Sequence, residues 1–388
     1  MASRPLEFIE KLAVQKPALA EDLGELGSLY QRKLWHQLTL KLEELYAKPD
    51  FSKGDLPVAL YNGFVADFGS KLNLLRLAHL AVAASKSLKD PAAAAAFLSA
   101  AVDKLAEWKL PRSEEPELYL RMHVAEKQLE MGAVAECKAA IEDGAAALER
   151  LPDPDPSVSA VVHYVSSLYY QLKKDYAKFY RSSMQYLAFV SSDALPPEFK
   201  APLAVDIALA ALLGEGVYGF AQLLMHPIVK VLQSGSYAWL GEMLEVFNRG
   251  DLPAYDALCA KHAATLNAQP ALVENERRLR EKVTISCLIN LISDLPPEQR
   301  NIPLSDIADR TKLNIDGVEF LLMKALSLHL IEGSIDQVDG TAAITWVQSR
   351  VLTQPQVAGL KERLDAWVSK VNAVGSTLEQ ESIGVAEV

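Results

Sequence analysis

Residues 302–347 constrain the fold of this chain more than any other stretch, because their pattern changes from helical to extended. A short helix with Ser305 as its N-cap precedes a turn, and a second helix begins near Asn314. The apolar face of this second helix, at spacings of three and four, consists of Ile315, Val318, Leu322 and Ala325. Asp339 and Gly340 then form a strong hairpin signal, since a type I′ turn needs a positive φ at both positions. Helix, turn, helix and hairpin in this order predict a winged helix.

The chain before this stretch is predicted to be almost entirely helical. Alanine and leucine dominate residues 6–266, and both favour helices. Proline ends a helix because it removes a backbone donor and clashes with the preceding turn. The predicted breaks between helices lie at residues 48–50, 110–116, 151–156 and 194–197.

The helical part contains a weak internal repeat. Residues 128–133 resemble residues 171–176, which lie 43 positions later, and residues 30–35 are a more diverged copy. In each copy a helix ends in a tight turn before another helix begins. Helix pairs that recur at about 35 to 45 residues are typical of solenoids of the tetratricopeptide or HEAT kind. The sequence therefore predicts a mostly α chain with a right-handed helical-repeat solenoid, and the alternative is an irregular helical bundle.

The remaining boundaries follow from prolines and from a change in composition. One long helix is predicted over residues 267–293, closed by Pro296 and Pro297. The tail beyond Gly375 is polar and contains glycine, which is typical of disorder. The predicted parts are a solenoid at 1–266, a linking helix with the winged helix at 267–350, a C-terminal helix at 351–374 and a disordered tail at 375–388.

The C-terminal helix carries a narrow apolar seam. From a start at Pro355, apolar residues recur at alternating spacings of three and four, as in the a and d positions of a heptad. These residues are Val357, Leu360, Leu364, Trp367, Val371 and Val374. A surface helix of a globular protein has a broader stripe, so we predict that this seam packs with helices of other chains in a bundle. The alternative is that it packs on its own winged helix.

No catalytic, cofactor-binding or metal-binding constellation is predicted. Residues 214–219 match the GxGxxG string of dinucleotide-binding proteins, but a helical run at 203–213 precedes them instead of a strand. They are therefore predicted to form a turn between helices. The seven histidines are scattered and no CxxC pair exists, so a metal site is not expected. The sequence predicts no cofactor and no enzymatic activity.

Charge argues against nucleic acid and membrane as partners. The formal net charge is −11, and residues 296–350 contain five basic against eight acidic side chains. A field of this sign repels phosphate, so DNA binding by the winged helix is the less favoured alternative. The most apolar stretch, residues 201–220, contains Asp206 and Glu215 and is not expected to span a membrane.

The cysteines and the first residues indicate a compartment. Three widely spaced cysteines are typical of reduced thiols in the cytoplasm and nucleus. Glu7 and Glu10 interrupt the opening residues, so no signal peptide is predicted.

The combination of helical repeats, a winged helix and the wing segment Leu330–Asp336 resembles the PCI-domain family. Members of this family are scaffold subunits of the proteasome lid, the signalosome and a translation initiation factor. Further segments resemble those of a proteasome lid subunit over nearly the whole chain, namely residues 60–64, 223–227, 239–240, 247–250, 323–327 and 345–352.

The resemblance implies a non-catalytic scaffold subunit of the 26S proteasome regulatory particle lid, in support of ubiquitin-dependent protein degradation. Such subunits associate side by side through their winged helices, and their C-terminal helices gather in a bundle. The partners it implies are neighbouring lid subunits and, as a further candidate, a ubiquitin-receptor subunit. The implied interface residues of the wing are Leu330, Ile331, Gly333, Ile335, Asp336, Ile344 and Trp346, and those of the helix are the seam. A signalosome or initiation-complex subunit is the alternative.

Overall fold

The computed structural model describes residues 4–16, 19–48, 51, 54–108, 110–233, 235–349 and 354–386. It divides into two compact units, Met1–Glu215 and Gly216–Val388. This division falls earlier in the chain than the predicted boundary after residue 266, because the helices α14 (Ala238–Arg249) and α15 (Leu252–Lys261) pack against α18 (Glu276–Asp294) of the second unit.

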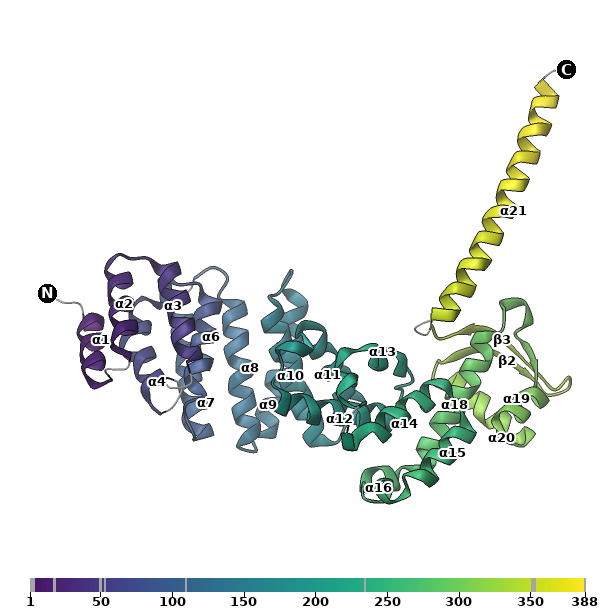
Figure 1. Ribbon diagram of the computed structural model, residues 1–388, viewed down its shortest axis with the longest axis horizontal. Coiled ribbons are helices and arrows are strands. Elements are labelled where there is room, and N and C mark those ends of the chain that lie inside the picture. The colour runs from purple at the N-terminus through teal and green to yellow at the C-terminus, as the bar shows by residue number, and fades with distance from the viewer. Residues whose placement is uncertain are drawn as a thin grey trace. The chain divides into compact units, whose positions relative to one another are not determined.

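Unit 1 is a row of helices that lie side by side in chain order (Figure 1). Some of the helices are joined by short 3-10 or π turns, which are η2 (Tyr61–Val65), η3 (Gly69–Lys71) and η4 (Ser192–Ala194). The α-helices are α1 (Arg4–Gln15), α2 (Ala20–Gln31), α3 (Trp35–Ala47), α4 (Leu56–Leu60), α5 (Ala66–Phe68), α6 (Leu74–Ser85), α7 (Pro91–Trp108), α8 (Glu114–Glu130), α9 (Val134–Arg150), α10 (Pro156–Lys173), α11 (Tyr176–Phe189) and α12 (Pro197–Leu213).

The predicted proline breaks are confirmed where the structure describes them. No α-helix runs through residues 110–113, 151–155 or 194–196, and α10 and α12 each begin at a proline. Residues 114–116 of the first predicted break instead form the first turn of α8. Proline suits the first turn of a helix because the N–H that it lacks would have no partner there. In the break predicted at residues 48–50, α3 has ended before Lys48, and residues 49 and 50 lie outside the described part of the chain.

The internal repeat rests on one local geometry. The three similar segments each contain a residue with left-handed backbone, with φ of 55° at Lys33, 83° at Gly132 and 57° at Lys174. In the second copy the N–H of Ala133 donates to the carbonyl oxygen of Gln128 at 2.9 Å, and the other two copies have the equivalent bond. This is the Schellman arrangement, which satisfies the last carbonyls of a helix and turns the chain back. The predicted helical-repeat fold is confirmed.

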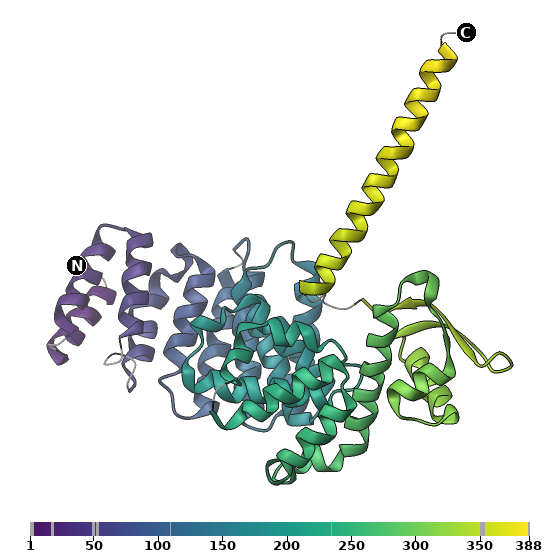
Figure 2. The same ribbon diagram turned by 45° about the vertical axis from the view of Figure 1, so that its right-hand side comes forward.

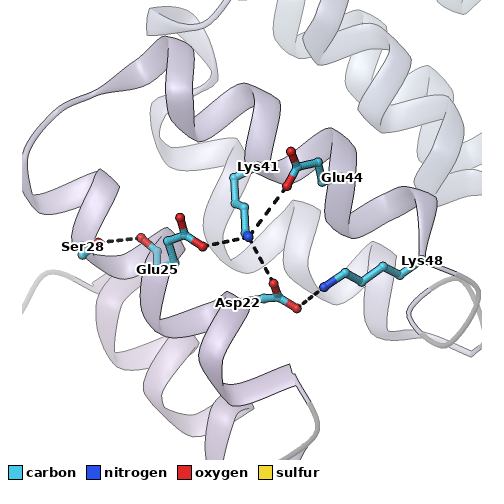
Figure 3. Close-up of polar contacts among 6 residues, drawn as sticks. All are labelled: Asp22, Glu25, Ser28, Lys41, Glu44 and Lys48. Atoms are coloured by element: carbon cyan, nitrogen blue, oxygen red, sulfur yellow. Dashed lines mark hydrogen bonds and ion pairs between the residues drawn. The ribbon is translucent and has the colours of Figure 1, made fainter.

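Apolar packing and surface ion pairs together hold the first helices of unit 1. Tyr30, Trp35 and Phe68 form an aromatic group with ring centroids 5.4–5.9 Å apart. On the surface, Lys41 of α3 pairs with Asp22 at 3.2 Å and with Glu25 at 2.7 Å, both on α2 (Figure 3). Lys48 binds the other carboxylate oxygen of Asp22, and its hydrogen bond is the largest cause that lowers the pKa of this carboxyl.

Unit 2 begins with short helices and turns that lead to the winged helix. They are α13 (Phe220–Met225), η5 (Pro227–Val231), η6 (Gly235–Tyr237), α14, α15, α16 (Ala263–Asn267), α17 (Pro270–Glu274) and α18. The single long helix predicted over residues 267–293 is therefore wrong. The helix breaks at Asn275, whose side-chain amide donates back to the carbonyl oxygen of Ala271 at 2.9 Å.

The predicted winged helix is confirmed over residues 301–347. Its elements are η7 (Pro297–Gln299), β1 (Asn301–Pro303), α19 (Leu304–Thr311), α20 (Ile315–Ser327), β2 (Ile331–Asp336) and β3 (Thr341–Val347). The strands form an antiparallel sheet in the order β1-β3-β2, and α18, α19 and α20 each contact a strand of it (Figure 2). Strand β1 was not predicted, because three residues are too few to show an alternating pattern.

Local details of the winged helix correct the sequence-based expectations. Asn314 caps α20 as predicted, and its side chain accepts from the N–H of Gly317 at 3.0 Å. Ser305 is not the N-cap of α19: Pro303 takes that position, and the Ser305 hydroxyl contacts Asp306. The hairpin turn has four residues, 337–340, and only Gly340 of these has a positive φ, so the type I′ prediction is wrong.

The last element, α21 (Gln354–Ala386), is longer than predicted. The tail expected to be disordered from residue 375 continues the helix to Ala386, and residues 387 and 388 lie outside the described part. Gly375 costs the helix about 1 kcal/mol relative to alanine, which does not end a helix of this length. The expected start of this part at residue 351 also lies outside the described residues.

Candidate functional site

The wing presents one free sheet edge. Within the described sheet, β2 pairs with β3 on one side only, so alternate backbone groups of β2 face outward. An edge of this kind can be extended or covered by another chain. The β2 edge is the part of the predicted site that consists of backbone N–H and C=O groups and does not depend on side chains.

A bulge in β3 decides which wing side chains reach the surface. Glu332 pairs with Trp346 and the next residue, Gly333, pairs with Ile344, which leaves Thr345 as an extra residue. Before the bulge, Ala342 and Ile344 face the core in alternation. The extra residue reverses this alternation, so Trp346 points outward with 43% of its surface exposed. The Trp346 side chain is therefore accessible, and its contact with a partner stays a prediction.

Most of the other predicted wing residues have structural roles. Leu330, Ile331 and Ile344 are buried in the winged-helix core, and Ile335 is half-buried against it. Their side chains pack in the core and hold the hairpin in place, and the expectation that they form an interface stays a prediction.

Two further wing residues serve the hairpin itself. The Asp336 carboxylate accepts from the N–H groups of Val338 and Asp339 at 2.9 and 3.1 Å and so stabilises the turn. Gly333 lies against β3, where a Cβ atom would approach the carbonyl oxygen of Ala343 to 2.2 Å. Both are required by the fold, and neither needs a partner to explain it.

The predicted seam on α21 is exposed. Its six residues each expose between 40% and 63% of their surface. The sequence-based prediction missed Leu378, which continues the heptad at the next a position and is also exposed because the helix extends beyond residue 374. Val368 is exposed beside the seam, at the position after Trp367, and widens the stripe. A stripe of this width suits contacts with more than one helix.

A second exposed apolar surface lies on α20. Val318, Leu322 and Ala325 face the core as predicted, but Ile315, at the first position of the helix, is exposed. Phe320 and Met323 are also exposed, and the sequence-based interpretation of this helix considered only its polar outer residues. The sequence signal that could have revealed them is that Phe320 and Met323 do not fall on the three- and four-residue spacing of the buried face.

No candidate metal centre lies within the described part of the chain. The described residues contain no group of three or more His, Cys, Asp or Glu side chains that could hold a metal ion. Residues 214–219 form a turn between α12 and α13 without a strand, as predicted. Burial raises the pKa of the Cys137 thiol to about 11, so this thiol stays protonated and unreactive near neutral pH. Among the described helices, none has the length and apolar character needed to span a membrane.

These observations define a class of protein. Helical repeats lead into a winged helix that has a free sheet edge, and the chain ends in a helix with an exposed apolar seam. The accessible features of the described residues are surfaces that suit contacts with other polypeptides, namely the β2 edge and the α21 seam. The architecture is that of a helical-repeat PCI-domain protein.

Comparisons with known proteins identify the family. Residues 23–244 match the PSD13 N-terminal repeats, and residues 259–346 match the PCI domain. The chain is 47% identical over 377 residues to the 26S proteasome non-ATPase regulatory subunit 13 homolog A of Arabidopsis thaliana, covering 97% of this chain and 98% of the relative. The Dictyostelium discoideum subunit 13 is 32% identical, with 98% of each chain covered. The chain belongs to the family of 26S proteasome non-ATPase regulatory subunit 13.

A more distant relative lies outside the proteasome. Eukaryotic translation initiation factor 3 subunit M of Aspergillus fumigatus is 26% identical over 179 residues, which cover 46% of this chain and 38% of the relative. The likeness to the subunit 13 proteins extends over about twice as much of the chain, so it decides the family.

Proposed function

We propose that this chain is a non-catalytic scaffold subunit of the lid of the 26S proteasome regulatory particle, and that it supports ubiquitin-dependent protein degradation through its contacts with other chains. The observation that carries this proposal is the exposed seam of α21, which no packing within the described residues covers. Membership in a family of proteasome regulatory subunits supports it.

The partners follow from the chemistry of the two surfaces. The seam is apolar along its length and is matched by similar helices of neighbouring lid subunits, gathered in a bundle. The edge of β2, with Trp346 beside it, offers backbone hydrogen bonds and an aromatic side chain to the winged helix of an adjacent PCI subunit. The helical arm of unit 1 is a candidate contact for a ubiquitin-receptor subunit. The proposed location is the cytoplasm and nucleus.

Two other functions remain as alternatives with less support. A scaffold subunit of an initiation complex or of the signalosome would use the same surfaces, but the initiation-factor likeness covers under half of the chain. Nucleic-acid binding would require polar or basic side chains on the outer face of α20. That face instead carries Phe320 and Met323 together with Asp316 and Glu319.

The seam is tested by charge placed on it. We expect that the double substitution Leu364→Asp and Trp367→Asp abolishes incorporation into the lid, because two carboxylates would have to be buried without partners. The monomer should stay folded, since both side chains are more than half exposed. Incorporation is measured by purifying the particle from cells that express the tagged variant and quantifying the chain by mass spectrometry.

The matched control places the same charges on the opposite face of the same helix. Ser369→Asp and Ala373→Asp lie away from the seam and are expected to leave incorporation unchanged. Normal incorporation of the seam variant would refute the proposal. Co-purification of the wild-type chain with initiation-factor or signalosome subunits, without the lid, would favour the first alternative.

A further inference from the structure

The winged helix has a groove on the side of α20 that neither the sheet edge nor the seam uses. It has a volume of about 320 Å³ and lies between α20, α18 and α15 of unit 2. That size is at the lower end of the range for binding pockets, so the groove accommodates a few side chains of a peptide.

The groove has an apolar wall on α20 and the turn before it. Phe320 lines it with 69% of its surface exposed, more than either Trp346 or Trp367, and the exposed Leu313 lies on the same wall. Met323 is exposed one turn further along α20. A phenylalanine side chain with this exposed fraction does not gain the free energy of burial, and this is unusual because the side chain can make only apolar contacts.

Basic side chains from both sides of the groove surround this apolar wall. Arg277 and Arg280 of α18 line the groove, together with Lys312 of the turn and Lys324 of α20. The two acidic residues of the lining are already paired: Asp256 with Arg280 at 3.3 Å, and Glu281 with Lys324 at 3.6 Å. Among the described residues, Arg277 and Lys312 have no acidic partner, so the groove carries two uncompensated positive charges in a chain of net charge −11.

We propose that this groove binds an acidic segment of a neighbouring polypeptide, which places an apolar side chain against Phe320 and carboxylates against Arg277 and Lys312. The apolar wall and the basic side chains together select this occupant. Basic side chains alone would suit phosphate, but the exposed Phe320 and Leu313 offer nothing to a phosphate backbone and favour a peptide that also carries an apolar side chain. The inference rests on the proposed function, because it supposes that the chain works among other chains.

The test is site-specific photo-crosslinking in cells. The photoreactive analogue p-benzoylphenylalanine replaces Phe320, which preserves an aromatic ring at an exposed position and should not disturb folding. After irradiation the tagged chain is purified and the crosslinked segment is identified by mass spectrometry. The expected result is a segment of another polypeptide with a net negative charge over the ten or so residues around the crosslink.

Two variants test whether the groove makes the contact. Arg277→Glu, combined with the crosslinker at position 320, should lower the crosslink yield at least about fivefold, because it reverses the charge that faces the segment. Lys261→Glu is the matched control, since Lys261 is an exposed cation of the same unit that does not line the groove, and it should leave the yield unchanged. The crosslinker placed at Leu172 of unit 1 should not capture the same segment.

The outcomes separate this inference from the proposed function. Absence of a crosslink, capture of a neutral or basic segment, or capture of nucleic acid would each overturn the inference. Incorporation into the lid is measured in the same cells by sedimentation of the tagged chain. A chain that is absent from the lid but still crosslinks to an acidic segment would refute the proposed function and retain the groove.

Discussion

The substitution Gly333→Ala tests whether the close contact between β2 and β3 requires glycine at this position, because its effect can be worked out from two distances. An alanine Cβ would lie 2.2 Å from the carbonyl oxygen of Ala343 and 3.0 Å from the Cα of Ile344. Since real contacts of this kind are essentially never under 3.0 Å, β2 and β3 must separate locally by about 0.8 Å. A shift of this size takes ladder hydrogen bonds of roughly 2.9 Å beyond the distance at which they still count as bonds.

The expected cost has two parts. Loss of two ladder hydrogen bonds costs about 1 kcal/mol each, and the residual overpacking adds about 1–3 kcal/mol. The hairpin should therefore lose about 3–5 kcal/mol of local stability, and its amides should exchange with solvent faster by a factor of roughly 100 to 3,000. Hydrogen exchange followed by mass spectrometry of peptides that cover residues 328–348 measures this directly. A global unfolding curve does not measure the local stability of the hairpin, because the chain has two compact units and its unfolding is not a single transition.

Ser334→Ala is the matched control for this prediction. Ser334 is the next residue of β2, its side chain is exposed, and its replacement should change exchange by less than about a factor of three. If Gly333→Ala exchanges as slowly as the wild-type chain, β3 absorbs the Cβ without separating. The argument that the bulge requires glycine at this position would then be wrong.

Two further predictions follow from the pKa values of lysine and aspartate side chains. Burial lowers the pKa of Lys282 from 10.5 to about 7 in the folded chain. Between these two pH values the folded chain holds fewer protons than the unfolded chain, so the stability of unit 2 should rise with pH there. Lys282→Met should remove about 2 kcal/mol of this rise between pH 7 and pH 9. Hydrogen exchange of peptides from unit 2, compared between the variant and the wild-type chain at each pH, measures the difference, and a difference that does not change with pH would contradict the burial argument. Asp22, whose pKa is lowered by Lys48 and Lys41, should favour the folded state at neutral pH. Asp22→Asn should cost less than about 1 kcal/mol, since solvent screens these pairs. The difference should begin to shrink as the pH falls below 3.8 and should vanish once the pH is below the lowered pKa of the folded chain; a difference that persists at still lower pH would show a cause other than charge.

Sequence patterns predicted the parts of this fold that local interactions decide. The Asn314 cap and the proline breaks each depend on residues within one turn of a helix. Each copy of the repeat turns the chain with one left-handed residue (Lys33, Gly132 or Lys174) and the same pair of backbone hydrogen bonds, all within one turn of a helix end. The fold class followed from these local signals, whereas the family was recognised by the resemblance of the wing segment and of six further segments.

The details of the site could not be predicted, because they depend on contacts between distant strands. An alternating pattern places Trp346 on the same face as Ile344, and only the extra residue Thr345 turns it outward. Strand β1 forms by pairing with β3, which its own three residues do not reveal. The exposure of Phe320 likewise follows from where α18 and α15 lie, which spacing along α20 does not determine.

The energetics of the seam indicate that it works together with a second surface. Full burial of an apolar side chain is worth about 1.5–3 kcal/mol, so covering the exposed half of each seam residue contributes roughly 1 kcal/mol per residue, or about 6–7 kcal/mol with Leu378 included. Association costs an estimated 4–15 kcal/mol in lost freedom of movement. One partner helix on the seam is therefore marginal, and the proposed contact at the β2 edge is needed to raise the effective concentration of α21 at its bundle. Truncating one seam residue should for this reason weaken incorporation only partly, whereas two buried carboxylates should exceed the whole contribution of the seam.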